Sequence, residues 1–436
     1  MILYIDPGTG SMLITIIIGL FGTALYFLRN LFLKVRFFGK KDKSNGEKLP
    51  IVIFSDDKRY WNVFEPICDE LEKREEKAVY MTESEDDPAL KKEYKFVETK
   101  CIGKGNMAYA KLNNVNAHVV VSTTPSLDVF QWKRSRNADH YIHVMHTPSD
   151  VAMYKMFGID YYDSILLSGK YQGEQVRTLE KERSLPEKAI EYVGIPYLDV
   201  MKNRLDSEKK NEKKTGDVTV LLAPSWGDNG ILKKYGSDFI DKLLDTGYKV
   251  IVRPHPQSFT TEKDMIDALM EKYPDSDKIS WNRDNDNFNV LKESDILISD
   301  FSGVIFEYAL VFDKPVIYTA ADYDKSTYDC AWLEKELWTF DVLPKIGMEL
   351  STDNFGNVKE LIDKCISSEE YAKGRDNARK ETWMYPGEGA KRTVDYIINK
   401  KDEFESLHKE DESEELYDDN EKNEIVEKEE GVEELA

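Results

Sequence analysis

Short apolar runs alternate with amphipathic stretches along most of the chain. The first runs, each predicted to be a buried strand, are Ile51–Ser55, Val79–Met81, His118–Ser122, Tyr141–Met145 and Ile165–Ser168. An amphipathic helix is predicted over Val63–Glu75, between the first two runs. Strands that alternate with helices form a parallel sheet that is covered on both faces. The pattern therefore predicts an open α/β domain over residues 50–206.

The same pattern starts again after a charged segment, Ser207–Asp217, which has no apolar residue and resembles a linker. The later strand candidates are Val218–Ala223, Lys249–Arg253, Asp295–Ser299 and Pro315–Thr319, and helices are predicted over Asp264–Lys272 and Val304–Phe312. A second α/β domain is thus predicted over 218–400. Two Rossmann-like domains joined in this way are expected to face a cleft, because open α/β sheets bind ligands at the carboxyl ends of their strands.

The N-terminal segment, residues 1–40, is predicted to be a membrane anchor with a basic flank. Pro7–Leu28 has 22 residues and no charge, about the length needed to cross a hydrocarbon core of about 30 Å. Lys and Arg residues follow this run, whereas a signal peptide would carry them before it. The positive-inside rule then predicts a single pass with the rest of the chain in the cytoplasm. A buried core helix is the alternative.

The charge of the chain is unevenly distributed. The formal net charge is -22, and residues 401–436 alone contain 17 Asp or Glu and 4 Lys. This composition predicts an acidic, disordered tail. The rest of the chain is only mildly acidic, which argues against nucleic-acid binding, because that function requires clustered Lys and Arg.

Several classes of protein are disfavoured by motifs that the sequence lacks. There is no GxxxxGK[ST] loop, no GxGxxG after a first strand and no HExxH or CxxC motif, which argues against P-loop NTPases, nicotinamide enzymes, zinc proteases and redox proteins. No cofactor and no metal is predicted. The four cysteines are scattered, as is typical of a reducing compartment.

The first candidate for chemistry is His146, directly after the strand Tyr141–Met145. A histidine at the carboxyl end of a strand can face the cleft and act as a general base, because its ordinary pKa lies near neutrality. A hydrogen-bonded structural histidine is the alternative, and it would be favoured if His146 stood alone.

The second candidate is the segment Arg253-Pro254-His255-Pro256, which follows the largely apolar stretch Tyr248–Val252. Two prolines restrict the backbone and hold Arg253 and His255 rigidly beyond the strand end. A guanidinium group suits phosphate, and an imidazole can donate a hydrogen bond to it. A proline-stiffened turn without function is the alternative.

The third candidate is the turn between the strand Asp295–Ser299 and the helix that follows it. Ser299, Asp300, Ser302 and Gly303 form a small polar turn, whose N–H groups could bind an anion with help from the helix dipole. Glu307 lies one turn into the helix and could reach a ribose hydroxyl. An ordinary helix cap, with Ser302 as the capping residue, is compatible with the same pattern.

These motifs occur in a recognisable order. The segments that carry the resemblance are His146-Thr147-Pro148, Ala223-Pro224-Ser225-Trp226, Arg253-Pro254-His255-Pro256, Leu297-Ile298-Ser299-Asp300-Phe301-Ser302 and Lys314-Pro315-Val316-Ile317-Tyr318. Together they resemble the CDP-glycerol glycerophosphotransferase family of teichoic-acid primases and polymerases, from about Ile51 to Ile398. The resemblance implies a GT-B fold, a donor nucleotide in the cleft and a lipid-linked acceptor at the cytoplasmic face of the membrane.

The resemblance also implies roles for single residues. His146 corresponds to the histidine that takes the proton of the acceptor hydroxyl while its oxygen attacks the β-phosphorus of the donor, and CMP leaves. His255 and Arg253 correspond to residues that bind the donor pyrophosphate, and the turn from Ser299 to Gly303 corresponds to the phosphate cradle. Thr147 and Gly303 depart from the family pattern, which usually has Gly and Ser at these positions.

The expected function is therefore transfer of glycerol phosphate, or of another polyol phosphate, from CDP-glycerol or a related CDP-polyol to a lipid-linked polymer acceptor. One alternative keeps the fold and uses a nucleotide sugar as donor. The other is a non-catalytic membrane scaffold that recruits cell-envelope enzymes through the acidic tail.

Overall fold

The computed structural model describes residues 48–208, 217–228, 230–284, 286–300, 302–319 and 324–409. Leu49 begins a compact unit that contains all of these residues except the first. The predicted membrane helix, Pro7–Leu28, and residues 410–436 of the predicted tail lie outside the described residues. No helix in the described ranges is both long enough and apolar enough to span a bilayer.

Within residues 48–208, seven strands form one parallel sheet in the order β3-β2-β1-β4-β5-β6-β7. The strands are β1 (Leu49–Ser55), β2 (Ala78–Thr82), β3 (Val97–Cys101), β4 (Ala117–Ser122), β5 (Ala138–Val144), β6 (Ser164–Leu167) and β7 (Ala189–Tyr192). The helices of this part are α2 (Trp61–Lys73), α3 (Asn106–Leu112), α4 (Lys170–Arg183) and α5 (Pro196–Ser207). The strand order reverses between β1 and β4, which is where open α/β sheets bind ligands.

Successive residues of the central strands are buried on opposite faces of this sheet. Ile51 and Ile53 of β1 pack with α2 on one face, and Val52 and Phe54 pack with α3 on the other. Because both faces are covered, β1 is a nearly continuous apolar run, as the sequence indicated.

A second parallel sheet of six strands, in the order β10-β9-β8-β11-β12-β13, is formed within the described part of 217–409. Its strands are β8 (Thr219–Leu222), β9 (Lys249–Val252), β10 (Ile279–Trp281), β11 (Ile296–Ser299), β12 (Val316–Thr319) and β13 (Gly347–Leu350). Its helices are α6 (Ile231–Asp245), α7 (Ser258–Thr261), α8 (Lys263–Lys272), α9 (Phe288–Glu293), α10 (Val304–Val311), α11 (Trp338–Ile346), α12 (Val358–Ser367) and α13 (Glu369–Thr382). The strand order again reverses between neighbours, here β8 and β11. Two parallel-sheet α/β domains were predicted, and both are present.

The second sheet is likewise covered on both faces. Helices α6, α8 and α12 pack on one face, against residues such as Leu222 and Ile298. Helices α9, α10 and α11 pack on the other, against residues such as Leu221 and Leu297. The nearly all-apolar α10 is buried in this second layer, so its N-terminus is held firmly at the end of β11.

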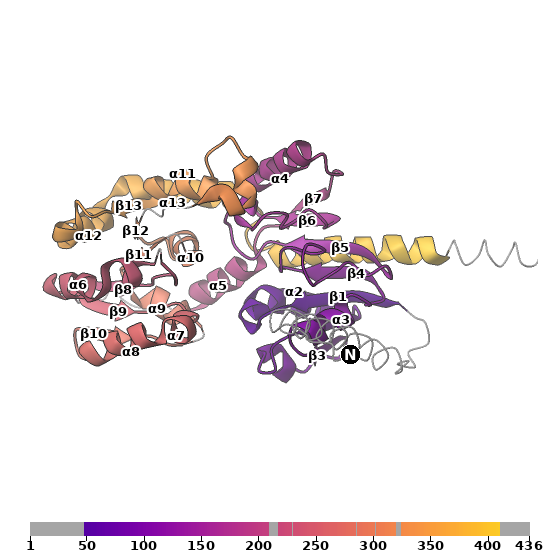
Figure 1. The fold of residues 1–436 in the computed structure, drawn as a ribbon, viewed down its shortest axis with the longest axis horizontal. Coiled ribbons are helices and arrows are strands. Elements are labelled where there is room, and N and C mark those ends of the chain that lie inside the picture. Colours follow the sequence, from indigo (N-terminus) through magenta and orange to yellow (C-terminus); the bar gives the residue numbers. More distant parts are fainter. Residues whose placement is uncertain are drawn as a thin grey trace, which may run out of the picture. The chain divides into compact units, whose positions relative to one another are not determined.

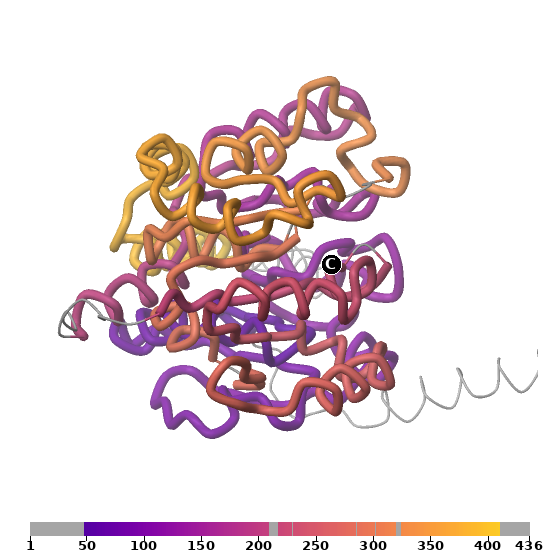
Figure 2. Tube along the Cα trace, turned by 90° about the vertical axis from the view of Figure 1, so that its left-hand side faces the viewer, coloured from indigo at the N-terminus to yellow at the C-terminus, as the bar shows by residue number. Residues whose placement is uncertain are grey.

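The chain crosses between the two sheets twice. Helix α5 follows the first sheet, but its Leu198 and Met201 belong to the core of the second. The last helix, described over 389–409, returns: its Val394 and Ile397 pack into the core of the first sheet. Figure 1 shows this yellow segment back beside the purple strands of the first sheet, and Figure 2 draws the chain in a view turned by 90°. The predicted second domain, 218–400, therefore includes a helix that packs on the first sheet.

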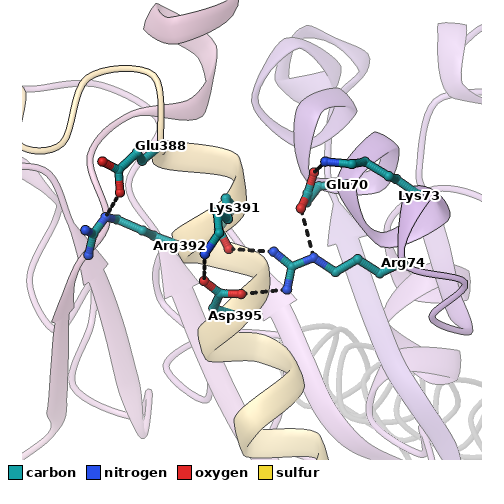
Figure 3. Close-up of polar contacts among 7 residues, drawn as sticks. All are labelled: Glu70, Lys73, Arg74, Glu388, Lys391, Arg392 and Asp395. Carbon is teal, nitrogen blue, oxygen red and sulfur yellow. Dashed lines mark hydrogen bonds and ion pairs between the residues drawn. The ribbon is translucent and has the colours of Figure 1, made fainter.

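Polar contacts fasten the last helix to the first domain. Arg74, which follows α2, donates to Glu70 at 2.8 Å, to Asp395 at 2.6 Å and to the Lys391 carbonyl at 3.3 Å (Figure 3). Lys401 pairs with Glu76 at 2.8 Å. Residues 401–409, which the composition assigned to a disordered tail, are thus the continuation of this helix.

Candidate active site

A cavity of about 530 Å³ lies between the carboxyl ends of the two sheets. The first domain contributes residues that follow β1 and β5, and the second contributes residues that follow β8, β9 and β11. Six of the eight predicted site residues line the cavity: His146, Arg253, His255, Ser302, Gly303 and Glu307. Segments far apart in the sequence thus meet at one place, where parallel α/β sheets present their ligand sites.

His146 lies just past the end of β5, with one ring nitrogen occupied. Its Nδ1 is 2.8 Å from the Thr123 hydroxyl, so Nε2 is the nitrogen left for a ligand. The Tyr60 ring packs edge-on against the imidazole, with ring centroids 5.0 Å apart. Burial, assisted by the charge of Arg59, lowers the pKa of His146 to about 4. At neutral pH the imidazole is therefore uncharged and can accept a proton.

Arg59 and Tyr60 line the cavity from the segment after β1, and neither was among the predicted site residues. The sequence contained a signal for them, because the polar run Asp56-Asp57-Lys58-Arg59 follows the first strand of a doubly wound sheet. The positive charge of Arg59 lowers the pKa of His146 in the first domain and the pKa of His255 in the second.

The geometry of the Arg253-to-Pro256 segment determines the tautomer of His255. The backbone N–H of Gln257 donates to His255 Nδ1 at 3.1 Å, so Nδ1 carries no proton. Burial, with Arg59 as a second cause, lowers the pKa of His255, so the ring is neutral and its proton resides on Nε2. Arg253 donates to the Asn282 side chain, which orients the guanidinium group. His255 Nε2–H and Arg253 together supply hydrogen-bond donors to the cavity.

The N-terminus of α10 forms part of the cavity wall at Ser302, Gly303 and Val304. The first N–H groups of a helix have no partner within the helix, and the helix dipole favours an anion there. The Thr147 hydroxyl of the first domain lies 3.3 Å from where a Cβ would stand on Gly303, so a side chain there would crowd the approach of the two domains.

Glu307 lines the cavity one turn into α10. Asn287 donates to its carboxylate at 2.6 Å, and Tyr197 of α5 is a second hydrogen-bond partner. Burial raises the pKa of Glu307 to about 7, which the hydrogen bonds and Arg253 only partly offset. The carboxyl group is therefore partly protonated at neutral pH and opposes an anionic ligand less than an ordinary glutamate would.

Two predicted binding residues, Ser299 and Asp300, do not reach the cavity. Both are fully buried. The Ser299 hydroxyl donates to the Ala223 carbonyl at 2.6 Å, and Asp300 accepts from the Ser225 N–H at 2.8 Å. Ser299 and Asp300 connect the end of β11 to the loop after β8, and their role in binding the substrate stays a prediction. These two hydrogen bonds hold the turn before α10 in place from the side away from the cavity.

The first residues of α11, and Asp329 in the segment before α11, connect the second domain to the first. Asp150 accepts from the N–H groups of Trp338 and Thr339, both at 2.8 Å. Asp329 accepts from the N–H groups of Phe157 at 2.8 Å and Gly158 at 3.1 Å. Thr339 itself lines the cavity, so the contact of Asp150 with Thr339 lies beside the site.

Comparison with known proteins identifies the family. Residues 43–399 match the family described as CDP-Glycerol:Poly(glycerophosphate) glycerophosphotransferase. A teichoic acid glycerol-phosphate primase from Bacillus spizizenii is 27% identical over 147 residues, which are 31% of this chain and 34% of that protein. The match thus spans about a third of the relative's length. The chain belongs to the glycerophosphotransferase family, as the resemblance predicted.

Solved structures support the two-domain fold. One is a structure of the wall teichoic acid polymerase TagF, soaked with CDPG, whose sequence is 17% identical to this chain. The alignment covers 88% of this chain and 98% of the TagF chain, with a TM-score of 0.53. The UDP-GlcNAc 2-epimerase of Methanocaldococcus jannaschii, in complex with UDP-GlcNAc and UDP, is 14% identical, covers 80% and 99%, and has a TM-score of 0.52. At these identities the likeness concerns the fold, and it agrees with the predicted GT-B-like pair of domains.

Proposed function

We propose that this member of the glycerophosphotransferase family moves glycerol phosphate, or another polyol phosphate, from a CDP-activated donor to a hydroxyl group of a lipid-linked cell-envelope acceptor. The observation that carries the proposal is the arrangement of the cavity. Arg253, the His255 Nε2–H and the N-terminus of α10 supply anion-binding groups on one side, and His146, a neutral base, stands on the other.

The donor pyrophosphate binds to the second domain in this proposal. Arg253 and His255 donate to its oxygens, the first N–H groups of α10 bind a phosphate, and Glu307 accepts from a ribose hydroxyl. These donors are fixed before the substrate arrives: Arg253 is held by Asn282, and His255 by the Gln257 N–H. Fixed donors stabilise the charge that develops on phosphoryl oxygens without reorganisation during the reaction.

The acceptor approaches from the first domain. Its hydroxyl oxygen forms the new bond to the β-phosphorus of the donor, and its proton passes to His146 Nε2. The bond between the β-phosphorus and the bridging oxygen breaks, and CMP leaves with that oxygen. A neutral His146 is required for this step, and the burial that lowers its pKa to about 4 supplies one at neutral pH.

The first test measures CMP release by the full-length protein supplied with CDP-glycerol and a lipid-linked acceptor extract. We expect His255→Ala to reduce kcat/KM by about 10²–10³-fold, the usual loss when a donor to a developing oxyanion is removed. His255→Gln, which places an N–H near the position of Nε2, should recover a part of this loss.

Other outcomes would change the proposal. Release of a nucleotide from CDP-ribitol or from a nucleotide sugar, but none from CDP-glycerol, would keep the fold and change the donor. No release with any donor from a folded protein would contradict the proposed activity and favour the scaffold alternative.

We also propose that the segment Pro7–Leu28 holds the enzyme at the membrane, with the catalytic domains on the cytoplasmic side. The support is the uncharged length of the segment and the basic residues that follow it. We expect the full-length chain to sediment with membranes, and a chain lacking residues 1–47 to lose most of this association. Equal sedimentation of both chains would contradict the anchor.

A further inference from the structure

Away from the cavity, three groups with metal-binding side chains come together: His118 of β4, Asp139 of β5 and His408 of the last helix. His118 Nδ1 lies 2.9 Å from Asp139 Oδ2, and His408 Nε2 lies 3.0 Å from the same oxygen. The two imidazole rings are 5.4 Å apart between centroids.

We propose that these residues form a site for a divalent transition metal ion of the Zn²⁺ class, which fastens the end of the last helix to the first sheet. The three potential ligand atoms all lie within 4.8 Å of one another. A tetrahedral ion about 2.0–2.2 Å from each ligand separates the ligands by roughly 3.3–3.5 Å, so small side-chain movements would admit it. Two imidazoles and one carboxylate are a ligand set that Zn²⁺ and its neighbours favour, with water completing the coordination.

The position of the cluster supports a structural role for the ion. His118 and Asp139 are second residues of their strands, at the amino ends of β4 and β5. The cavity lies at the opposite, carboxyl ends. The proposed site is thus separate from the transfer reaction, and the inference does not rest on the proposed function.

The environment is suited to a cation. The side chains of His118 and Asp139 are only 11% and 15% exposed, and that of His408 is 42% exposed, so the site is enclosed and still accessible to an ion. The sequence that follows Lys409 is strongly acidic, which raises the local concentration of cations. The same three groups can also hold one another by two hydrogen bonds, and the experiment distinguishes the two states.

The ligands are far apart in the sequence, which explains why spacing rules did not reveal them. His118 and Asp139 are 21 residues apart, and Asp139 and His408 are 269 residues apart. Only the return of the last helix to the first sheet brings the third ligand to the other two.

The test uses the full-length chain, from which metal has been removed by a chelator and dialysis. Co²⁺ is added as a spectroscopic probe of binding, and the effect of Zn²⁺ on thermal unfolding is measured separately. We expect one equivalent of Co²⁺ with visible d–d absorption. Zn²⁺ at about a hundred times its Kd should raise the Tm by roughly 3 °C. Asp139→Asn, which preserves the hydrogen bonds, and His408→Ala, at a partly exposed position, should each remove both effects while circular dichroism shows a folded chain.

Lys401→Ala is the matched control. It removes the ion pair between the same helix and Glu76, so it should lower the Tm and leave the Co²⁺ spectrum and the Zn²⁺ response unchanged. The proposal is overturned if the parent chain binds no Co²⁺. It is also overturned if Asp139→Asn and His408→Ala take up the ion as the parent does, since the metal would then be bound elsewhere.

Discussion

Replacing His146 with glutamine is expected to lower kcat for CMP release by about 10²–10⁴-fold, the range over which a positioned general base accelerates proton transfer. The reason is the position of its Nε2, which faces the cavity while Nδ1 contacts Thr123. His140→Gln is the control in β5, the strand that precedes His146, because His140 contacts Ser164 and does not line the cavity. A His146→Gln enzyme that retains the parent kcat, with its fold intact, would exclude the residue as the base.

The pH dependence of the same reaction tests the protonation state of His146. The pKa of His146 is lowered from 6.5 to about 4, so the base is unprotonated above pH 5 and activity is lost only as the pH falls toward 4. We therefore expect kcat/KM to remain nearly constant from pH 7.5 to about 5.5, where a base with an ordinary histidine pKa would lose about tenfold.

Two accompanying variants make the pH profile interpretable. Glu307 also titrates at the cavity, with a pKa near 7, so the profile is repeated in Glu307→Gln to remove its contribution. Thr123→Val tests how Thr123 positions the imidazole of His146. We expect a lower kcat with little change in KM, because valine cannot make the hydrogen bond to Nδ1 that favours the tautomer with Nε2 free. The folded fraction is followed at each pH, since a lowered histidine pKa also reduces stability between about pH 6.5 and 4.

The central strands of both sheets could be predicted from the sequence, and the edge strands could not. Every strand missed by the apolar-run criterion stands at the edge of a sheet: β3, β7, β10 and β13. The edge strand β7, for example, is only partly buried along its length. An edge strand has fewer neighbours to cover it, so it need not be a continuous apolar run.

The sequence predicted those residues of the candidate site that lie just after the carboxyl end of a strand. His146, Arg253 and His255 directly follow strands at their carboxyl ends, and the structure places all three on one cavity. The orientation of the turn after β11 could not be deduced. Ser299 and Asp300 are polar residues at the right position, but they are turned to the neighbouring strand end. The sequence therefore indicates which loop reaches the cavity, but the packing of that loop decides which of its side chains face the cavity.

The largest effect on stability is expected from Arg183→Leu. Arg183 ends α4 with a side chain that is 4% exposed, and it pairs with Asp160 at 2.7 Å and with Asp329 of the loop after β12. Both carboxylates are buried. Removing the cation leaves two unpaired buried charges, which should reduce the free energy of unfolding by about 3–5 kcal/mol at pH 7. Lys181→Leu, an exposed substitution on the same helix, should change it by less than about 0.5 kcal/mol.

The sign of the pH dependence provides a second measurement on this variant. Burial already raises the pKa of Asp160 and of Asp329 above the usual aspartate range, despite Arg183. Without Arg183 both pKa values rise further, so the folded state binds protons more strongly than the unfolded state does. The stability deficit of Arg183→Leu should therefore be largest near pH 7 and diminish toward pH 5 in urea unfolding. A deficit that is independent of pH would show that Arg183 stabilises the domain contact mainly through its packing against Phe157 and Trp332.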